Sequence, residues 1–202
     1  MRKKNFLTKL NPRMKFRGVR GIRYNEDGIS AVEFAIIAPL MILLFFGCIE
    51  ISLMMRLDRK VATTSSSLGD LTARLSSVND GQMSEMFAAA SVLLEPNDIT
   101  KARMRITSIV DSGDGVTKVD WSDGYNLTAY SAGANITVPN GIVSSPGSVI
   151  LAEVEYDYEN KLGYVIDFGG TLSDRFYLRP RRVEKIPRTR SGGSDPAFGP
   201  TS

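Results

Sequence analysis

The chain has 202 residues, with 25 lysines and arginines against 22 aspartates and glutamates, one cysteine and no histidine. The single Cys48 excludes an intrachain disulfide and a cysteine-rich metal site, and without histidine the common nucleophile–base pairs lose their usual base. The length allows one globular domain beside a membrane segment.

Residues 1–28 form a basic segment, predicted to be a cytoplasmic leader. Its charges exceed those that closely follow the next segment, and cytoplasmic flanks of membrane helices are enriched in Lys and Arg. The excess predicts a cytoplasmic N-terminus and an exported C-terminal part. Nucleic-acid binding is a weak alternative for the leader, and no nucleic-acid partner is expected. The two sets are Arg2, Lys3, Lys4, Lys9, Arg13, Lys15, Arg17, Arg20 and Arg23, and then Arg56, Arg59 and Lys60.

An apolar run from residue 29 to residue 55 follows, and it carries no charge between Phe34 and Ile49. It exceeds the roughly 20 residues that a membrane-spanning helix needs, so the lipid bilayer is an expected partner. A buried helix of a soluble protein is the less favoured alternative. No small-x-small motif closely follows the run, so removal as a secretory signal peptide is not expected. Pro39 is expected to kink the helix or to be absorbed by its neighbours.

A seam of positions spaced three and four apart predicts that the helix continues past the membrane. The seam packs either on the chain's own domain, which is favoured, or on a neighbouring chain. After a break at 79–81, a second helix is predicted over Gln82 to Leu94, closed by the residues 95–98. The seam consists of Met54, Leu57, Val61, Thr64, Leu68, Leu71, Leu75 and Val78.

Strands are predicted in the rest of the chain, the first two joined as a hairpin by the turn at 111–115. Residues 163–168 are expected to be irregular. The predicted plan is a leader (1–28), a transmembrane helix (29–55), an exported α+β domain (56–188) and a disordered Gly/Ser/Pro tail (189–202). The fold class is α+β, in which the membrane helix is extended by an amphipathic helix and packed with a small, mostly antiparallel sheet. The strands are 101–110, 116–121, 134–138, 148–158 and 171–182.

Two of these strands carry opposite charges. Antiparallel pairing is expected to set acid against base on a solvent face and apolar against apolar on the core face. Glu155 and Arg179 are the pair chosen to test this register. An anion or partner site at Arg179, Arg181 and Arg182 is the alternative. The expected ion-pair residues are Glu153, Glu155 and Asp157 on one strand, with Glu159 beyond it, and Arg175, Arg179 and Arg181 on the other.

Catalytic chemistry has no motif in this sequence. Asp111, Asp114, Asp120 and Asp123 do not match the spacing of a calcium-binding loop and are interpreted as turn residues. No glycine-rich phosphate loop follows a strand. An enzymatic function and a cofactor are therefore not expected.

Glu33 is a carboxylate inside the apolar run, where it costs about 2.5–3.5 kcal/mol at mid-membrane and less near the edge. In one interpretation it reaches the interface and benefits from the helix dipole. In the other, a cut after Gly28 frees the amine of Ile29 about one turn away, and the two charges pair.

The segment from Gly28 to Phe34 resembles the type IV prepilin processing signature, with glycine before the cut and glutamate fifth after it. Continued through Pro39 to Gly47 and Glu50, it resembles the TadE-like family of Tad/Flp pilus assembly proteins. Residues 153–158 and 172–182 are similar to the closing strands of alphaproteobacterial members. Type IV pilins usually begin with phenylalanine after the cut, whereas this chain offers Ile29.

The resemblance implies a minor pilin or pseudopilin of the bacterial inner membrane, with a periplasmic domain. A prepilin peptidase would cut between Gly28 and Ile29, and other pilin or assembly subunits would be partners. Glu33 would align subunits or aid recognition by the peptidase. The alternative is a permanently anchored envelope protein whose exported domain binds a partner or ligand.

Overall fold

The structure is a computed structural model that describes residues 27–111, 113, 115–159 and 169–191. The chain divides into two compact units, Met1–Phe45 and Phe46–Ser202, and each is described by itself. In the first unit, the described residues belong to helix α1, whose full bounds are Asp27–Ala73 and which runs through Pro39. Of the predicted elements, the irregular segment 163–168 lies outside the described residues.

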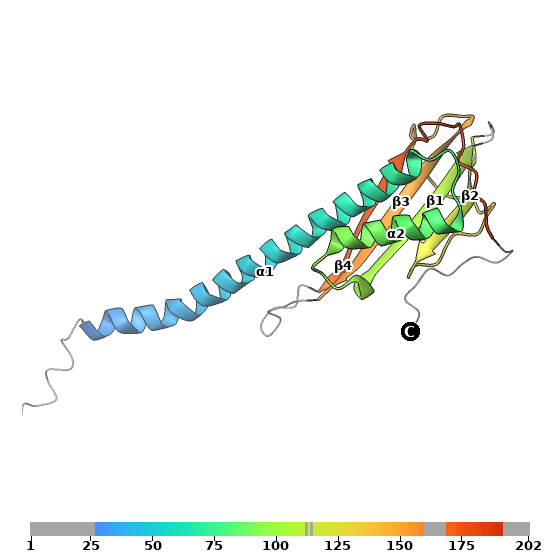
Figure 1. Cartoon of the computed structure of the whole chain (residues 1–202). Helices are drawn as coiled ribbons and strands as arrows, with labels where there is room; N and C mark the ends of the chain where they lie inside the picture. Colours follow the sequence, from blue (N-terminus) through green and yellow to red (C-terminus); the bar gives the residue numbers. More distant parts are fainter. Residues whose placement is uncertain (1–26, 112, 114, 160–168, 192–202) are drawn as a thin grey trace, which may run out of the picture. The chain divides into compact units, whose positions relative to one another are not determined.

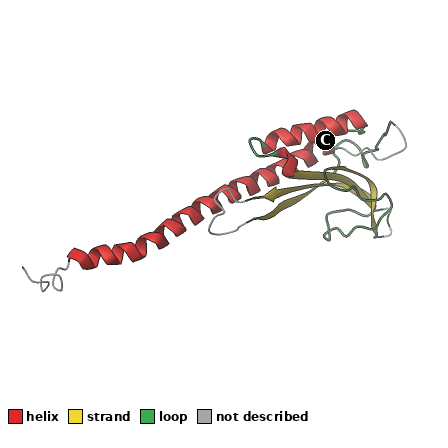
Figure 2. Ribbon diagram, turned by 90° about the horizontal axis from the view of Figure 1, so that it is seen from below, coloured by secondary structure: helices red, strands yellow, loops and turns green. Residues whose placement is uncertain are grey.

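The second unit has two layers, helices on one side and a sheet on the other (Figure 1). The Phe46–Ala73 part of α1 and helix α2 (Asp80–Leu94) lie side by side over one face of the sheet, as Figure 2 also shows. The sheet is antiparallel with the order β2-β1-β3-β4, so the predicted α+β class is confirmed. Its strands are β1 (Ala102–Asp111), β2 (Thr117–Tyr125), β3 (Gly147–Tyr158) and β4 (Gly170–Leu178), preceded by a short 3-10 helix, η2 (Ile99–Lys101).

The predicted seam packs on the chain's own core. Leu57, Val61 and Leu68 are buried in one cluster with residues of α2 and of the helix-facing side of the sheet. The helix ends before the seam does, because α1 stops at Ala73, and Leu71 is 41% exposed. Leu75 and Val78 lie beyond the helix but still pack in or against the same cluster. The carbonyl of Ala73 accepts the backbone N–H of Arg181 at 2.9 Å, so a contact from the segment after β4 closes this helix.

The predicted break at 79–81 is the start of α2. The side chain of Asn79 accepts the backbone N–H of Gln82 at 2.9 Å, and the Gln82 side chain accepts the backbone N–H of Asn79 at 3.0 Å. This reciprocal capping box satisfies two backbone donors that a helix start leaves unpaired. The helix therefore begins at Asp80, two residues before the predicted start.

The hairpin of β1 and β2 is confirmed, and β2 extends to Tyr125. The carboxylate of Asp111 accepts the backbone N–H groups of Gly113 and Gly115, both of which have positive φ, as expected for a turn aspartate.

Two strand predictions need correction. Residues 134–138 do not form a strand, because they are paired with β2 by a single isolated bridge, between Lys118 and Asn135. The last strand ends at Leu178 rather than Arg182, since the chain passes through Pro180 and brings Arg181 to the end of α1. Pro180 has no backbone N–H to donate to a strand partner.

Candidate functional site

The apolar part of α1 exposes its side chains on every side. Residues 28–46 are exposed except for Ala38, and the first buried residue of the helix is Glu50. The helix is long and apolar enough to cross a membrane. Exposed apolar side chains all round a helix are costly in water and favourable in lipid. Residues 28–49 therefore fit the thickness of a bilayer core.

The predicted processing residues lie in the first two turns of α1. Gly28, Ile29 and Glu33 are all exposed, with Ile29 at 58%. A Cβ atom built on Gly28 would meet no atom within 4 Å. The packing of the described residues thus does not require glycine at position 28, so a requirement for glycine there would come from outside them.

Glu50 is a buried carboxylate where α1 meets the domain. It is 3% exposed, and the Tyr158 hydroxyl donates a hydrogen bond of 2.5 Å to its Oε1. Burial, and then this hydrogen bond, raise the pKa of Tyr158 to about 12. Tyr158 is the last residue of β3, so the contact joins this part of α1 to the end of a central strand. The glutamate was recognised in the sequence, but its partner was not.

The acidic side chains of β3 face basic side chains of β1 as well as β4. In the register of the sheet, Arg103 lies opposite Glu155 and Arg105 opposite Glu153. Arg103 forms ion pairs with Glu155 at 3.2 Å and with Asp157 at 3.0 Å. Outside the strands proper, Lys101 pairs with Glu159 at 2.6 Å. Lys101, Arg103 and Arg105 stand at alternate positions of the sequence, which indicates a basic face on this strand but not that β1 lies beside β3.

Glu153 lies between two arginines. Its Oε2 accepts from Arg105 at 2.6 Å and its Oε1 from Arg175 of β4 at 3.0 Å. The prediction that these charges lie on a solvent-exposed face is wrong here, because the side chains of Glu153 and Arg105 are only 3% and 10% exposed. The guanidinium of Arg105 lies 3.6 Å from the ring centre of Tyr130 and donates to the carbonyl of Thr128 at 2.8 Å. The connection between β2 and β3 therefore covers this ion pair.

The predicted pair of Glu155 and Arg179 is wrong. Glu155 lies opposite Ser173 in β4, and Arg179 lies beyond the strand, where it donates to the carbonyl of Ile142 at 3.3 Å. Arg181 pairs instead with Asp70 of α1 at 2.5 Å. Because β4 ends at Leu178, the arginines that follow it cannot continue the alternation of the strand.

A second buried charge cluster ties the C-terminal segment to the domain. Arg188, 3% exposed, pairs with Asp123 of β2 at 2.8 Å and with Asp80 of α2 at 2.6 Å. The backbone N–H of Ser191, and then Arg188, lower the pKa of Asp80. Trp121 also donates from its ring nitrogen to the carbonyl of Ile186 at 2.7 Å. Residues 189–191, assigned to the tail from the sequence, thus contact the fold.

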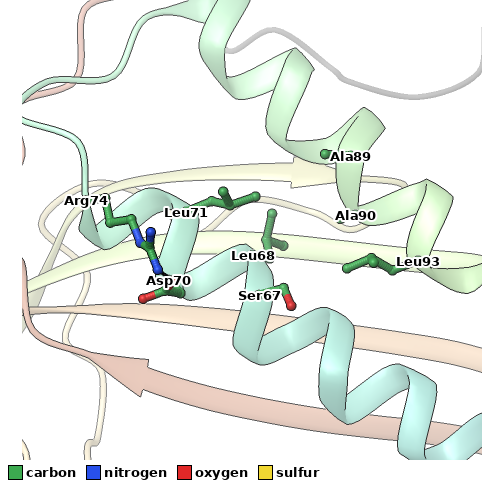
Figure 3. A pocket seen from close by; sticks show the side chains of 8 residues that line it. All are labelled: Ser67, Leu68, Asp70, Leu71, Arg74, Ala89, Ala90 and Leu93. Carbon is green, nitrogen blue, oxygen red and sulfur yellow. Dashed lines mark hydrogen bonds and ion pairs between the residues drawn. The ribbon is translucent and has the colours of Figure 1, made fainter.

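A groove of about 350 Å³ lies between the end of α1 and α2 (Figure 3). Its floor is apolar, and the charges at its rim neutralise each other, since Asp70 pairs with Arg74 at 2.5 Å and with Arg181. In the part of the chain that the structure describes, no three side chains form a metal-binding group. The groove is lined by Ser67, Leu68, Asp70, Leu71, Arg74, Ala89, Ala90 and Leu93.

Residues 28–66 match the family model described as TadE-like protein, which confirms the resemblance that the N-terminal motif predicts. No curated protein and no solved structure is significantly similar to the chain. The match covers the exposed apolar part of α1 and the first turns that pack on the domain. The match ends before the sheet, so it gives no support for the sheet or for its charge clusters.

Proposed function

We propose that this chain, TadE-like over residues 28–66, is a minor pilin or pseudopilin-like membrane protein that assists assembly of a Tad pilus. It acts as a structural part and not as a catalyst. The observation that carries the proposal is that the matched segment is one helix with two environments. Its first half exposes apolar side chains suited to lipid, and from Glu50 onward it packs into a domain core.

The proposed topology follows from the flanking charges. The basic leader lies in the cytoplasm, residues 29–49 cross the inner membrane, and the chain from Glu50 onward forms the periplasmic domain. A prepilin peptidase on the cytoplasmic side removes residues 1–28, and Ile29 becomes the new N-terminus. The chain then meets other pilin or assembly subunits in the bilayer.

Substitution of Gly28 by valine tests processing, with Gly47→Val as a matched control. Both glycines lie in α1, and at both a Cβ atom would meet nothing within 4 Å, so neither change is expected to disturb the fold. Mass spectrometry of membrane fractions should find chains that begin at Ile29 in the wild type and in Gly47→Val. Gly28→Val should keep its leader. A wild-type chain that retains residues 1–28 would instead favour a permanently anchored envelope protein.

Glu33→Gln separates the two roles proposed for that carboxylate. If Glu33 aligns subunits through the amine of Ile29, the variant is cut normally but pilus assembly falls. If it aids the peptidase, the leader is retained. A deletion strain complemented with each variant provides the readout of surface pili, and normal pili in the deletion strain would contradict the assembly role.

A further inference from the structure

The two edges of the sheet differ. The outer edge of β2 is covered, because Val119 donates its backbone N–H to Ala134 at 2.9 Å and Ile136 donates to Thr117 at 3.1 Å. No comparable backbone hydrogen bond reaches the outer edge of β4 from any other described residue. None of the nine residues of β4 is buried. Outward-facing N–H and C=O groups of an edge strand are ready to pair with another strand.

Few side chains of β4 oppose such pairing. Residues 170–178 contain neither proline nor lysine, and of the other charged side chains that can protect an edge they carry Asp174 and Arg175 alone. Phe176 is 40% exposed on the face that carries the helices. An added strand could therefore bury apolar surface as well as form backbone hydrogen bonds.

The centre of the strand carries two charges on opposite faces. Asp174 lies opposite Val154, and among the described residues it has no ion-pair partner. Arg175 is 63% exposed and shares the carboxylate of Glu153 with Arg105. Both charges at the edge are thus available to side chains of an incoming strand.

These charges disfavour a second copy of the chain. Two β4 strands that pair antiparallel about a two-fold axis set residues of the same face opposite each other. The register that uses all nine residues places Asp174 against its own copy, and the register centred on Arg175 places Arg175 against its own copy. Like charges directly opposite each other are destabilising. The register centred on Ser173 sets Asp174 opposite Leu172 and Arg175 opposite Thr171, so it leaves both charges without an oppositely charged partner.

We propose that the outer edge of β4 binds an extended segment of a different protein by strand addition. The segment carries an acidic residue opposite Arg175 and a basic residue opposite Asp174, and it covers the ring of Phe176. Main-chain hydrogen bonds supply affinity, and the two charges set register and favour a strand of complementary charge over a second copy of β4. The site lies outside the segment that supports the pilus role and does not depend on that role.

Photo-crosslinking in the native host tests the site. A benzophenone amino acid replaces Ser173, which is exposed in β4, and Ser84, which is exposed on α2, as the control. An adduct is expected at position 173 and not at 84, and the peptide recovered from it by mass spectrometry should be an extended segment of another chain. The adduct can be read whether or not the leader is removed and whether or not pili form.

Two substitutions sharpen the result. Arg175→Glu and Phe176→Lys should each lower the adduct at position 173 at least about fivefold, because charge reversal and loss of apolar cover each weaken the pairing. Reversal of the facing acidic residue in the partner should restore the yield in Arg175→Glu. Fluorescence of the buried Trp121 checks that both variants remain folded. The proposal is overturned if no adduct exceeds the control, if the adduct joins two copies of this chain, or if Arg175→Glu leaves the yield unchanged.

Discussion

Replacement of Glu153 by glutamine is expected to lower the free energy of unfolding of the domain by about 3 kcal/mol. The variant keeps the size of the side chain but leaves the guanidinium of Arg105 without its carboxylate. Removal of one partner of a buried ion pair costs about 3–5 kcal/mol. We expect the lower end, because Arg105 keeps its hydrogen bonds to Thr128 and Tyr130, and Arg175 is exposed enough for water to solvate it.

Glu155→Gln is the matched control. It changes the same residue type on the same face of β3, two positions away. The side chain of Glu155 is 28% exposed, and its partner Arg103 is 33% exposed and also pairs with Asp157. Exposed pairs of this kind contribute about 1 kcal/mol or less. The two variants should therefore differ by about 2 kcal/mol although each removes one carboxylate charge.

Urea unfolding of the full chain in detergent micelles measures the difference. Trp121 is the only tryptophan and is 4% exposed, so its fluorescence follows the domain and not the membrane segment. With a slope of about 2 kcal/mol per molar urea, Glu153→Gln should lower the midpoint by about 1.5 M. Arg105→Met combined with Glu153→Leu should recover part of the loss, because no unpaired charge remains buried. Equal losses for Glu153→Gln and Glu155→Gln would refute the assignment of a buried pair.

Two further variants test contacts at the ends of elements. Asn79→Ala removes the cap of α2 and should cost about 1 kcal/mol in the same urea assay, whereas Ser84→Ala in the exposed interior of that helix should cost little; equal effects would contradict the capping box. Tyr158→Phe tests pH dependence. Because the folded chain holds the pKa of Tyr158 at about 12, above the usual value of 10, its hydroxyl stabilises the fold fully below about pH 10 and progressively less up to pH 12. Alkaline titration followed by Trp121 should show this decline to be steeper in the wild type than in Tyr158→Phe, and identical curves would contradict the buried contact with Glu50.

Local patterns in the sequence predicted the elements that depend on local physics. The apolar run, the spacing of Leu57, Val61 and Leu68, and the alternation in β1 and β3 each appear in the structure because helix and strand periods are properties of a short segment. The N-terminal motif was equally visible, and the family match covers it. The acidic face of β3 was predicted for the same reason.

Elements that depend on distant contacts were predicted less well. The spacing of the seam predicts helix past Ala73, although a backbone N–H from Arg181 closes the helix there. The arginines after Leu178 favour a longer strand, although the chain turns toward α1. No local pattern around Arg188 predicts that this segment links α2 to β2. The signal for this contact in the sequence is Ile186 and Pro187, two apolar residues that directly precede the alternating arginines at 188 and 190.

The sequence by itself determined that the chain has an apolar helix long enough for a membrane, a processing-type motif before it and an α+β domain after it. Only the tertiary structure decided which charges meet. Sheet order placed β1 beside β3, so Arg103 and Arg105 join the acids that the sequence had matched with β4 alone. The physical reason is that side-chain alternation fixes the face of a residue, whereas its neighbour depends on strand order and register, which are set by packing across the whole domain.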